Sequence, residues 1–193
     1  MAGVMVAGTR EPSAAGALLA RYVGRRIAEM GVTLIVGGAP GIDTEALLGA
    51  IEAGGQILLV LPWVNPAPFK HIDEILKRAR HVGFHRYHLD NAVILVRATA
   101  FNKPRLADAA FKARTELAVE EADAVVVVEA KTPKPGRGWG TYYAVKYAVR
   151  RGKHVYILEP SVDDQRVRDA FNILTSLGAK PVRSIDEVLV RIS

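Results

Sequence analysis

Short apolar runs alternate along the chain with longer segments of mixed polarity. The apolar runs predict buried strands, at Val4–Ala7, Val32–Val36, Gln56–Leu61, Ala124–Val128 and His154–Leu158. The longer segments predict helices, at Ser13–Met30 (capped by Ser13), Thr44–Ala53, Leu106–Glu121, Gly140–Arg151 and Asp163–Leu177. A short strand at Pro181–Arg183 and a helix from Asp186 complete the pattern. We therefore predict one doubly wound α/β domain over residues 1–193, with a mostly parallel sheet and helices on both faces.

The middle of the chain has a weaker pattern. Residues 62–68 contain three prolines and predict a loop, residues 72–80 predict a helix, and residues 91–96 predict an additional strand. We interpret residues 62–105 as a divergent segment of the domain.

The strand at Val32–Val36 runs directly into a glycine-rich turn, Gly37-Gly38-Ala39-Pro40-Gly41-Ile42-Asp43. The glycines allow a tight turn and a close approach of a ligand to the backbone, and Asp43 is predicted to cap the next helix. Free amides at a helix start favour an anion, although any doubly wound protein needs tight turns of this kind. Because ligands of open α/β sheets bind at these strand ends, we expect an anion-binding site here.

Two further turns are expected at the same edge of the sheet. Gly8-Thr9-Arg10 follows the first strand, and Arg10 there is suited to phosphate or, alternatively, to pairing with Glu11 or Asp43. Residues 131–141 follow the fourth strong strand and could hold a phosphate at the next helix start. The candidate phosphate, nucleotide or DNA contacts are Gly8, Thr9, Arg10, Gly37, Gly38, Ala39, Gly41, Ile42, Asp43, Arg114, Glu129, Gly138, Gly140 and Thr141.

The chain is basic, with a formal net charge of +6 and a sequence pI of about 9.7, which favours a phosphate-bearing partner. Several cations could line a groove for a polyanion: Lys103, Arg105, Lys112, Arg114, Lys131, Lys134, Arg137, Arg150, Arg151 and Lys153. Four aromatic residues near them could stack on bases: Phe101, Trp139, Tyr142 and Tyr143. The alternatives are a solvated helix face for the cations and core packing for the tyrosines.

Other classes of function lack their signatures. Cysteine is absent, no apolar run approaches the ~20 residues of a membrane span, and no signal peptide is recognised, so we expect a cytoplasmic protein without a membrane partner. Neither a P-loop ending nor dinucleotide spacing is present, and no acid follows the third strand, which argues against an NAD-dependent dehydrogenase. Excess arginine over lysine, with few asparagines and glutamines, favours a thermophilic protein.

The sequence also gives little indication of a catalytic or metal-binding site. His81, His85, His88 and Asp90 lie near one another in sequence but fit no metal-protease pattern, so we expect no metal and no cofactor. No serine–histidine pairing or carboxylate pair stands out, and Glu116 and Glu129 are the only acids to watch. We therefore expect no catalytic residue.

These turns together resemble the DNA-processing protein A (DprA/Smf) family. Gly8-Thr9-Arg10 is similar to its Gly-Ser-Arg turn, and residues 37–43 are similar to its Gly-Gly-Ala-x-Gly-Ile-Asp motif. Arg114 stands where the family's Arg-Asn-Arg begins, and Gly140-Thr141 is similar to its Gly-Ser helix start. The resemblance covers roughly residues 2–60 and 112–160, with Leu47 in place of a family histidine and Glu116 in place of the second arginine.

The resemblance implies a Rossmann-like core that binds single-stranded DNA, forms a homodimer or higher homo-oligomer, and has a recombinase as partner. Residues 37–43 would hold backbone phosphates through their amides, with Arg10 and Arg114 as cationic contacts. The wider superfamily includes lonely-guy-type phosphoribohydrolases, whose Gly-Thr turn residues 135–141 loosely resemble. Ala144 stands where their catalytic glutamate would lie, so a nucleotide-binding module without that activity is the alternative.

Overall fold

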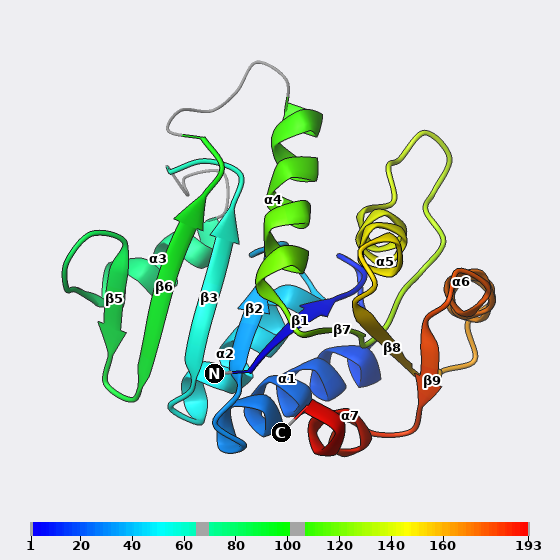
Figure 1. The fold of residues 1–193 in the computed structure, drawn as a ribbon, viewed down its shortest axis with the longest axis horizontal. Helices are drawn as coiled ribbons and strands as arrows, with labels where there is room; N and C mark the ends of the chain where they lie inside the picture. The colour runs from blue at the N-terminus through cyan, green and yellow to red at the C-terminus, as the bar shows by residue number, and fades with distance from the viewer. Residues whose placement is uncertain (1, 65–69, 101–106, 193) are drawn as a thin grey trace.

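The computed structural model describes residues 2–64, 70–100 and 107–192 (Figure 1). Its strands are β1 (Gly3–Ala7), β2 (Thr33–Val36), β3 (Gln56–Leu61), β4 (Arg80–His81), β5 (Arg86–Leu89), β6 (Ala92–Ala98), β7 (Ala124–Val127), β8 (His154–Leu158) and β9 (Lys180–Val182). Its helices are α1 (Ala14–Glu29), α2 (Ile42–Glu52), α3 (Lys70–Arg78), α4 (Ala107–Glu121), α5 (Gly140–Arg150), α6 (Gln165–Ser176) and α7 (Ile185–Ile192).

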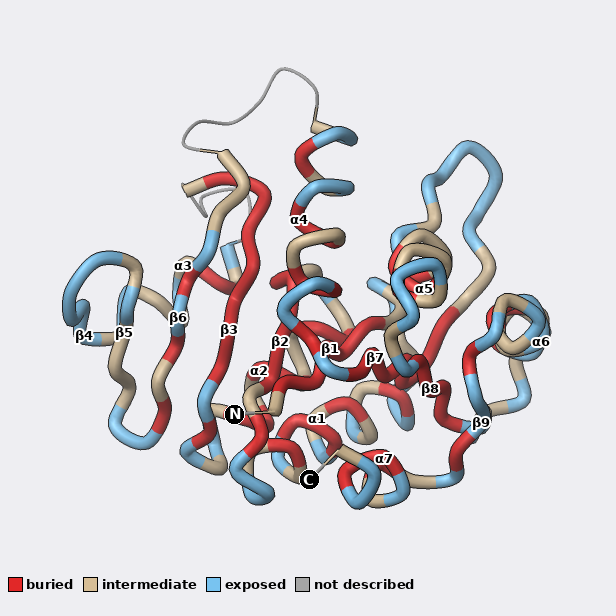
Figure 2. Tube along the Cα trace, in the orientation of Figure 1, coloured by how far each residue is buried: buried red, intermediate tan, exposed pale blue. Residues whose placement is uncertain are grey.

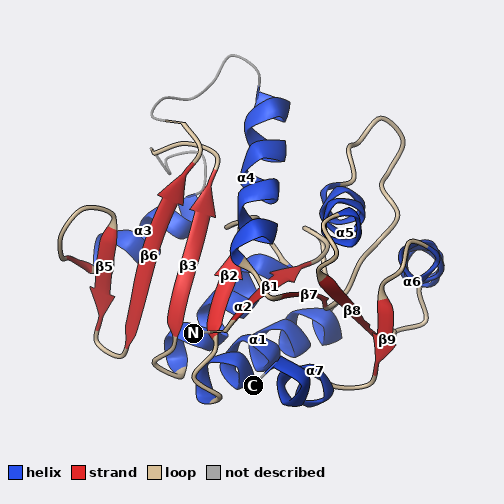
Figure 3. Ribbon diagram, viewed as in Figure 1, coloured by secondary structure: helices blue, strands red, loops and turns tan. Residues whose placement is uncertain are grey.

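The described strands form one sheet in the order β4-β5-β6-β3-β2-β1-β7-β8-β9. Strands from β6 to β9 along this order are parallel, whereas β4 and β5 pair antiparallel at one edge (Figure 3). The predicted doubly wound fold with a mostly parallel sheet is therefore confirmed.

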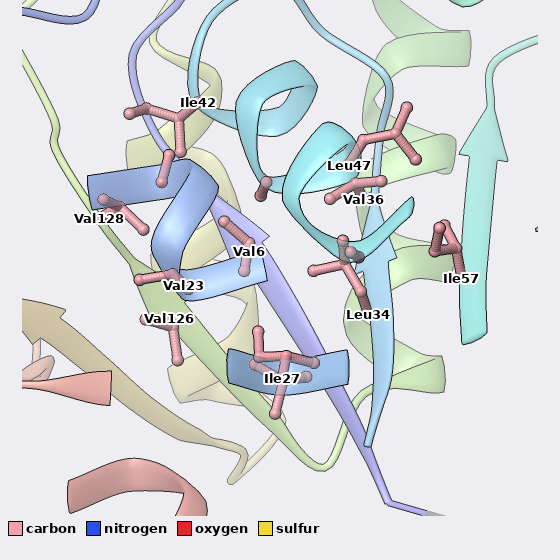
Figure 4. Packing of buried hydrophobic residues seen from close by; sticks show 14 of the residues in the cluster. Val6, Val23, Ile27, Leu34, Val36, Ile42, Leu47, Ile57, Val126 and Val128 are labelled. Carbon is pink, nitrogen blue, oxygen red and sulfur yellow. The ribbon is translucent and has the colours of Figure 1, made fainter. Parts of the chain in front are cut away.

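Two hydrophobic cores cover the two faces of this sheet. On one face, α1, α2, α3 and α7 pack against alternate strand residues; Val6 and Val126 lie beneath Val23 and Ile27 of α1 (Figure 4). On the other face, α4, α5 and α6 pack against the residues between, such as Val125 and Val127. The central strands are buried on both sides (Figure 2), which explains why they read as continuous apolar runs rather than as alternating patterns.

Most sequence-predicted elements are confirmed within two residues of their ends. Ser13 caps α1 as predicted, because its side-chain oxygen accepts a hydrogen bond from the Gly16 amide. The prediction failed to identify β4 and β5, whose residues are mainly polar or half-buried. Phe101, Lys103, Arg105 and residues 65–69 lie outside the described residues.

No helix in the described ranges is long and apolar enough to cross a membrane.

Candidate anion-binding site

Three turns meet at the carboxyl edge of the sheet, as the sequence predicts. β1 lies between β2 and β7, so the turns that follow these strands are neighbours. The Thr9 amide donates to the Glu129 carbonyl at 2.8 Å, and the Thr9 carbonyl accepts from the Ile42 amide at 3.2 Å. The Thr141 hydroxyl donates to the Gly8 carbonyl at 3.0 Å. These hydrogen bonds join the three turns into one connected site.

Gly8 is required at the centre of this junction. A Cβ atom there would lie 2.5 Å from a side-chain carbon of Ile42 and 2.7 Å from the Glu129 carbonyl oxygen. Both distances are shorter than van der Waals contact, so the turns could approach this closely only around a glycine.

Asp43 does not cap α2, contrary to the prediction. Gly41 is the N-cap residue, with a φ of 84° that favours glycine, and α2 begins at Ile42. Asp43 is therefore the second helical residue, and its buried side chain turns back toward the preceding strand. Its Oδ2 atom accepts hydrogen bonds from the Gly37 amide at 3.1 Å and the Ala39 amide at 3.3 Å. Asp43 thus fixes the shape of the turn from within.

This arrangement also corrects which amides can hold an anion. The Gly37 and Ala39 amides are occupied by Asp43, and the Ile42 amide by the Thr9 carbonyl. Within the described part of the chain, the amides of Gly38, Gly41 and Asp43 make no hydrogen bond. The Gly41 and Asp43 amides lie at the start of α2 and the Gly38 amide lies in the turn before it, and these three are candidate donors for a ligand.

Arg114 reaches this turn from α4 and is buried beneath it. Its Nη1 atom lies 3.8 Å from Asp43 Oδ2, and both side chains are 10% exposed. A Cβ on Gly37 would lie 1.2 Å from the same nitrogen, so the guanidinium occupies the space that a side chain would fill. The Nε atom of Arg114 is buried and has no partner within the described chain. Arg114 is therefore a buried support of the turn, and the cationic contact with phosphate that the resemblance implies for it stays a prediction.

Burial dominates the protonation equilibria of this pair. Loss of hydration raises the pKa of Asp43, an effect opposed by the neighbouring Arg114 cation and by the two backbone hydrogen bonds. Burial also lowers the pKa of Arg114; Asp43 opposes this shift, and the Arg10 cation adds to it. Two guanidinium groups thus act on a single carboxylate at this turn.

Arg10 is the exposed cation of the site. Its guanidinium carbon lies 5.8 Å from the centre of the Phe111 ring, and that of Arg114 lies 5.9 Å from the same ring. Arg10 forms no ion pair with any described carboxylate, so the predicted alternatives of pairing with Glu11 or Asp43 are wrong. The Phe111 ring packs edge-on against Trp63, with ring centres 5.5 Å apart.

Glu129 and Thr141, two candidate contacts, are already engaged within the protein. Glu129 is 6% exposed and accepts hydrogen bonds from the Ser13 amide and hydroxyl, which anchors the start of α1 to the end of β7. Its nearest cation is Lys131, at 3.9 Å. The buried Thr141 hydroxyl donates its hydrogen bond to the Gly8 carbonyl. Sequence reasoning missed both internal roles because each partner is more than a hundred residues away.

The third turn presents its glycines to solvent. Gly138 and Gly140 are exposed, and a Cβ at either would meet no atom within 4 Å. An ion pair of 2.9 Å between Lys134 and Glu11 ties this loop to the first turn. The packing around Gly138 and Gly140 therefore gives no support to their predicted contact with phosphate.

The predicted groove of cations does not form among the described residues. Lys153 and Arg151 follow α5 at the opposite, amino edge of the sheet, where both bind Glu120. Lys131 is half-buried between Glu129 and Asp164. Of the aromatic candidates, Trp139 and Tyr142 stack on each other and pack against the core, and Tyr143 donates its hydroxyl hydrogen to Glu116.

The histidines also fail to form a site. His81 and His88 stand on adjacent antiparallel strands but lie in neighbouring pairs, His81 opposite Tyr87 and His88 opposite Arg80, so they point to opposite faces. No group of three potential metal ligands comes together in the described ranges.

Known proteins with this architecture were found by sequence and by structure. A Smf protein from Synechocystis is 27% identical over 187 residues, which cover 97% of this chain and 43% of that protein. DNA processing protein A from Streptococcus pneumoniae has a TM-score of 0.73 at 23% identity, covering all of this chain and 62% of that one. The chain therefore spans about half the length of these relatives.

Two further structures share the fold. DNA processing protein A from Helicobacter pylori, described for its single-stranded DNA binding mode, has a TM-score of 0.70 at 20% identity and covers 98% of this chain and 79% of that one. A molybdenum cofactor binding protein from Rippkaea orientalis has a TM-score of 0.62 at 22% identity, with 98% and 93% covered. At these identities the similarity establishes the fold alone.

The family model decides between these neighbours. The model for DNA recombination-mediator protein A matches residues 1–193, including residues 62–105, which lie outside the motif resemblance. Together with the Smf relative, this match confirms the resemblance to the DNA-processing protein A family. The chain belongs to the DNA recombination-mediator protein A family.

Proposed function

We propose that this protein binds single-stranded DNA at the carboxyl edge of β1 and β2. A backbone phosphate accepts hydrogen bonds from the amides of Gly38, Gly41 and Asp43, and the Arg10 guanidinium pairs with it from the solvent side. The observation that carries the proposal is the combination of unpartnered amides at a helix start with an exposed, unpaired arginine on the adjoining turn. Family membership and the DNA-binding relative from Helicobacter pylori support it.

The charge balance of the turn favours an anion. Arg10 and Arg114 face the single carboxylate of Asp43, and Arg10 contributes to lowering the pKa of the buried Arg114. A bound phosphate offsets this excess positive charge without a new desolvation cost at Arg114, which is already buried. In this account Arg10 contacts the ligand, whereas Arg114 and Asp43 position the turn.

A role in DNA recombination follows from the family, and we include it in the proposal. A recombinase partner and a homodimer or higher homo-oligomer are the further steps that the resemblance implies. The phosphate contacts require neither step, so DNA binding can be tested on the isolated chain.

The same donors could instead bind a small nucleotide, and the two ligands differ in how salt affects them. A polymer that contacts several phosphates loses affinity steeply with salt, with a slope of about −0.7 in log–log units per phosphate on a single strand. Fluorescence anisotropy of a labelled single strand across a salt series, with AMP and duplex DNA as competitors, separates them.

Salt-steep binding that AMP does not displace is expected. Absence of binding to the strand, with AMP raising the melting temperature, would overturn the DNA proposal in favour of a nucleotide module.

A further inference from the structure

The edge of the sheet formed by β4, β5 and β6 leaves one face uncovered. Helix α3 covers the opposite face of these strands, where Ile72 of α3 and Ile94 of β6 belong to the same hydrophobic core. On the face shared with α4, no described helix covers these strands (Figures 1 and 2). Leu95, which is 41% exposed, pairs with Leu58 of β3, and Leu58 belongs to the core beneath α4. The uncovered face is thus a continuation of the α4 side of the sheet.

Strand register identifies the side chains on this uncovered face. Residues directly opposite each other in paired strands point to the same side. Arg80 pairs with His88, His88 with Val93, and Arg86 with Leu95. With Arg97, two positions beyond Leu95, we define the uncovered sheet face by the following residues: Arg80, Arg86, His88, Val93, Leu95 and Arg97.

The uncovered sheet face carries excess positive charge. Arg97 is paired with Glu121 at the end of α4, but Arg80 and Arg86 form no ion pair with any described residue. Arg86 is diagonal to Arg80 across the β4–β5 pair, a relationship that separates the two residues by about 7–8 Å. Two unpaired arginines placed diagonally on neighbouring strands repel each other, and an anion bound between them offsets the repulsion.

Phe84 stands at the tip of the β4–β5 turn and is 82% exposed. Backbone hydrogen bonds hold this turn in place. The Val82 amide donates to the Arg86 carbonyl, and the Val96 amide donates to the His85 carbonyl, both at 2.8 Å. His85 has a positive φ of 57°, which is uncommon for a residue other than glycine. The backbone therefore adopts a sparsely populated conformation in this turn. The Phe84 ring contacts the His85 ring edge-on and is otherwise exposed to water.

We propose that the uncovered sheet face and Phe84 form a second contact surface for the same DNA strand. Arg80 and Arg86 bind backbone phosphates, and a base stacks on the Phe84 ring. The inference rests on the proposed function, because the strand must also occupy the glycine turns. Across the sheet, β5 with Arg86 lies three strand spacings from β2, about 14 Å, and β4 with Arg80 lies four, about 19 Å. A strand with phosphates ~3.4 Å apart covers these distances in about four to six nucleotides, so only a longer ligand reaches both surfaces.

Cations on an edge strand also protect a sheet against pairing with another chain, and an exposed aromatic ring could serve contact with a second copy. These alternatives predict no effect on DNA affinity. They are therefore distinguished by the experiment that tests the proposal.

The test compares binding of labelled single strands of about three and about twelve nucleotides across a salt series. The variant Arg80→Ala/Arg86→Ala is matched by Arg25→Ala/Arg191→Ala, which removes equal charge near the carboxyl-terminal ends of α1 and α7. Phe84→Ala removes the ring, and Arg80→Lys/Arg86→Lys keeps the charge. All these positions are exposed, and circular dichroism checks the fold.

For the long strand, Arg80→Ala/Arg86→Ala should weaken binding and reduce the salt slope by about 1.4, the value for two phosphates. Phe84→Ala should weaken binding about fivefold or more without changing the slope. The lysine variant should keep the slope, and binding of the short strand should not change in any of them.

An Arg80→Ala/Arg86→Ala variant that matches its control on the long strand would overturn this inference. If Arg10→Ala still weakens binding in that case, the proposed function stands. Wild-type protein that binds neither strand would overturn both. A Phe84→Ala variant with unchanged DNA affinity but an altered sedimentation coefficient would assign the ring to contact between copies instead.

Discussion

The Nη1 atom of Arg114 lies 3.8 Å from Asp43 Oδ2, in the space left by the missing side chain of Gly37. Two residues of the turn and one from the distant helix α4 thereby determine its shape. Asp43 holds the Gly37 and Ala39 amides, and Arg114 compensates the buried carboxylate. The amides that remain for a ligand are a consequence of this internal arrangement.

Replacing Asp43 by alanine should destabilise the fold. The change leaves the buried Arg114 guanidinium without its carboxylate and two turn amides without an acceptor, which together cost about 3 kcal/mol or more. Urea unfolding measures the loss. Asp186→Ala removes the partner of Arg26 on the surface and serves as the control, with little change expected. Equal destabilisation by both variants would show that Asp43 has no special role.

Gly37→Ala should be much more damaging than Gly138→Ala. The new methyl group at residue 37 would collide with Arg114, whereas the one at residue 138 meets no atom within 4 Å. We expect a loss of about 1–3 kcal/mol for the first variant and a change within about 0.5 kcal/mol for the second. Melting curves of the two proteins test this, and similar midpoints would contradict the packing described for Arg114.

Tyr143 should make stability depend on pH in the alkaline range. Its hydrogen bond to Glu116, and then burial, raise the pKa of the Tyr143 phenol to about 12. Because the folded-state pKa lies above the unfolded value of about 10, this contribution is complete below pH ~10 and is lost as the pH rises toward 12.

The matched variant for this effect is Tyr143→Phe. The difference in unfolding free energy between wild type and variant should narrow from about pH 9 to about pH 11.5. A constant difference over that range would mean that the Tyr143 phenol titrates at its ordinary pKa.

The strands and helices could be predicted far better than the site. Apolar runs such as Ala124–Val128 identify buried parallel strands because both faces are covered, and Ser13 identifies the start of α1. β4 and β5 escaped prediction because one of their faces is solvated and basic, so their pattern lacks an apolar signal.

The roles within the site depend on distances that sequence spacing does not reveal. Glu129 was a candidate ligand contact, but it binds Ser13, whose hydroxyl is brought to it only by the pairing of β1 with β7. Arg114 was a candidate cationic contact, and nothing in the sequence indicates that Gly37 leaves the room in which it is buried. A single sequence does not reveal that a glycine on one element packs against an arginine on another.

Arg10→Ala tests the account most directly, with Arg25→Ala as a control that removes equal charge from the far end of α1. Anisotropy with a labelled single strand across a salt series should give weaker binding for Arg10→Ala and a salt slope reduced by about 0.7, one phosphate contact. Arg25→Ala should bind like the wild type, and both variants should melt like it. An Arg10→Ala protein with unchanged affinity and slope would show that DNA does not bind at the glycine turns.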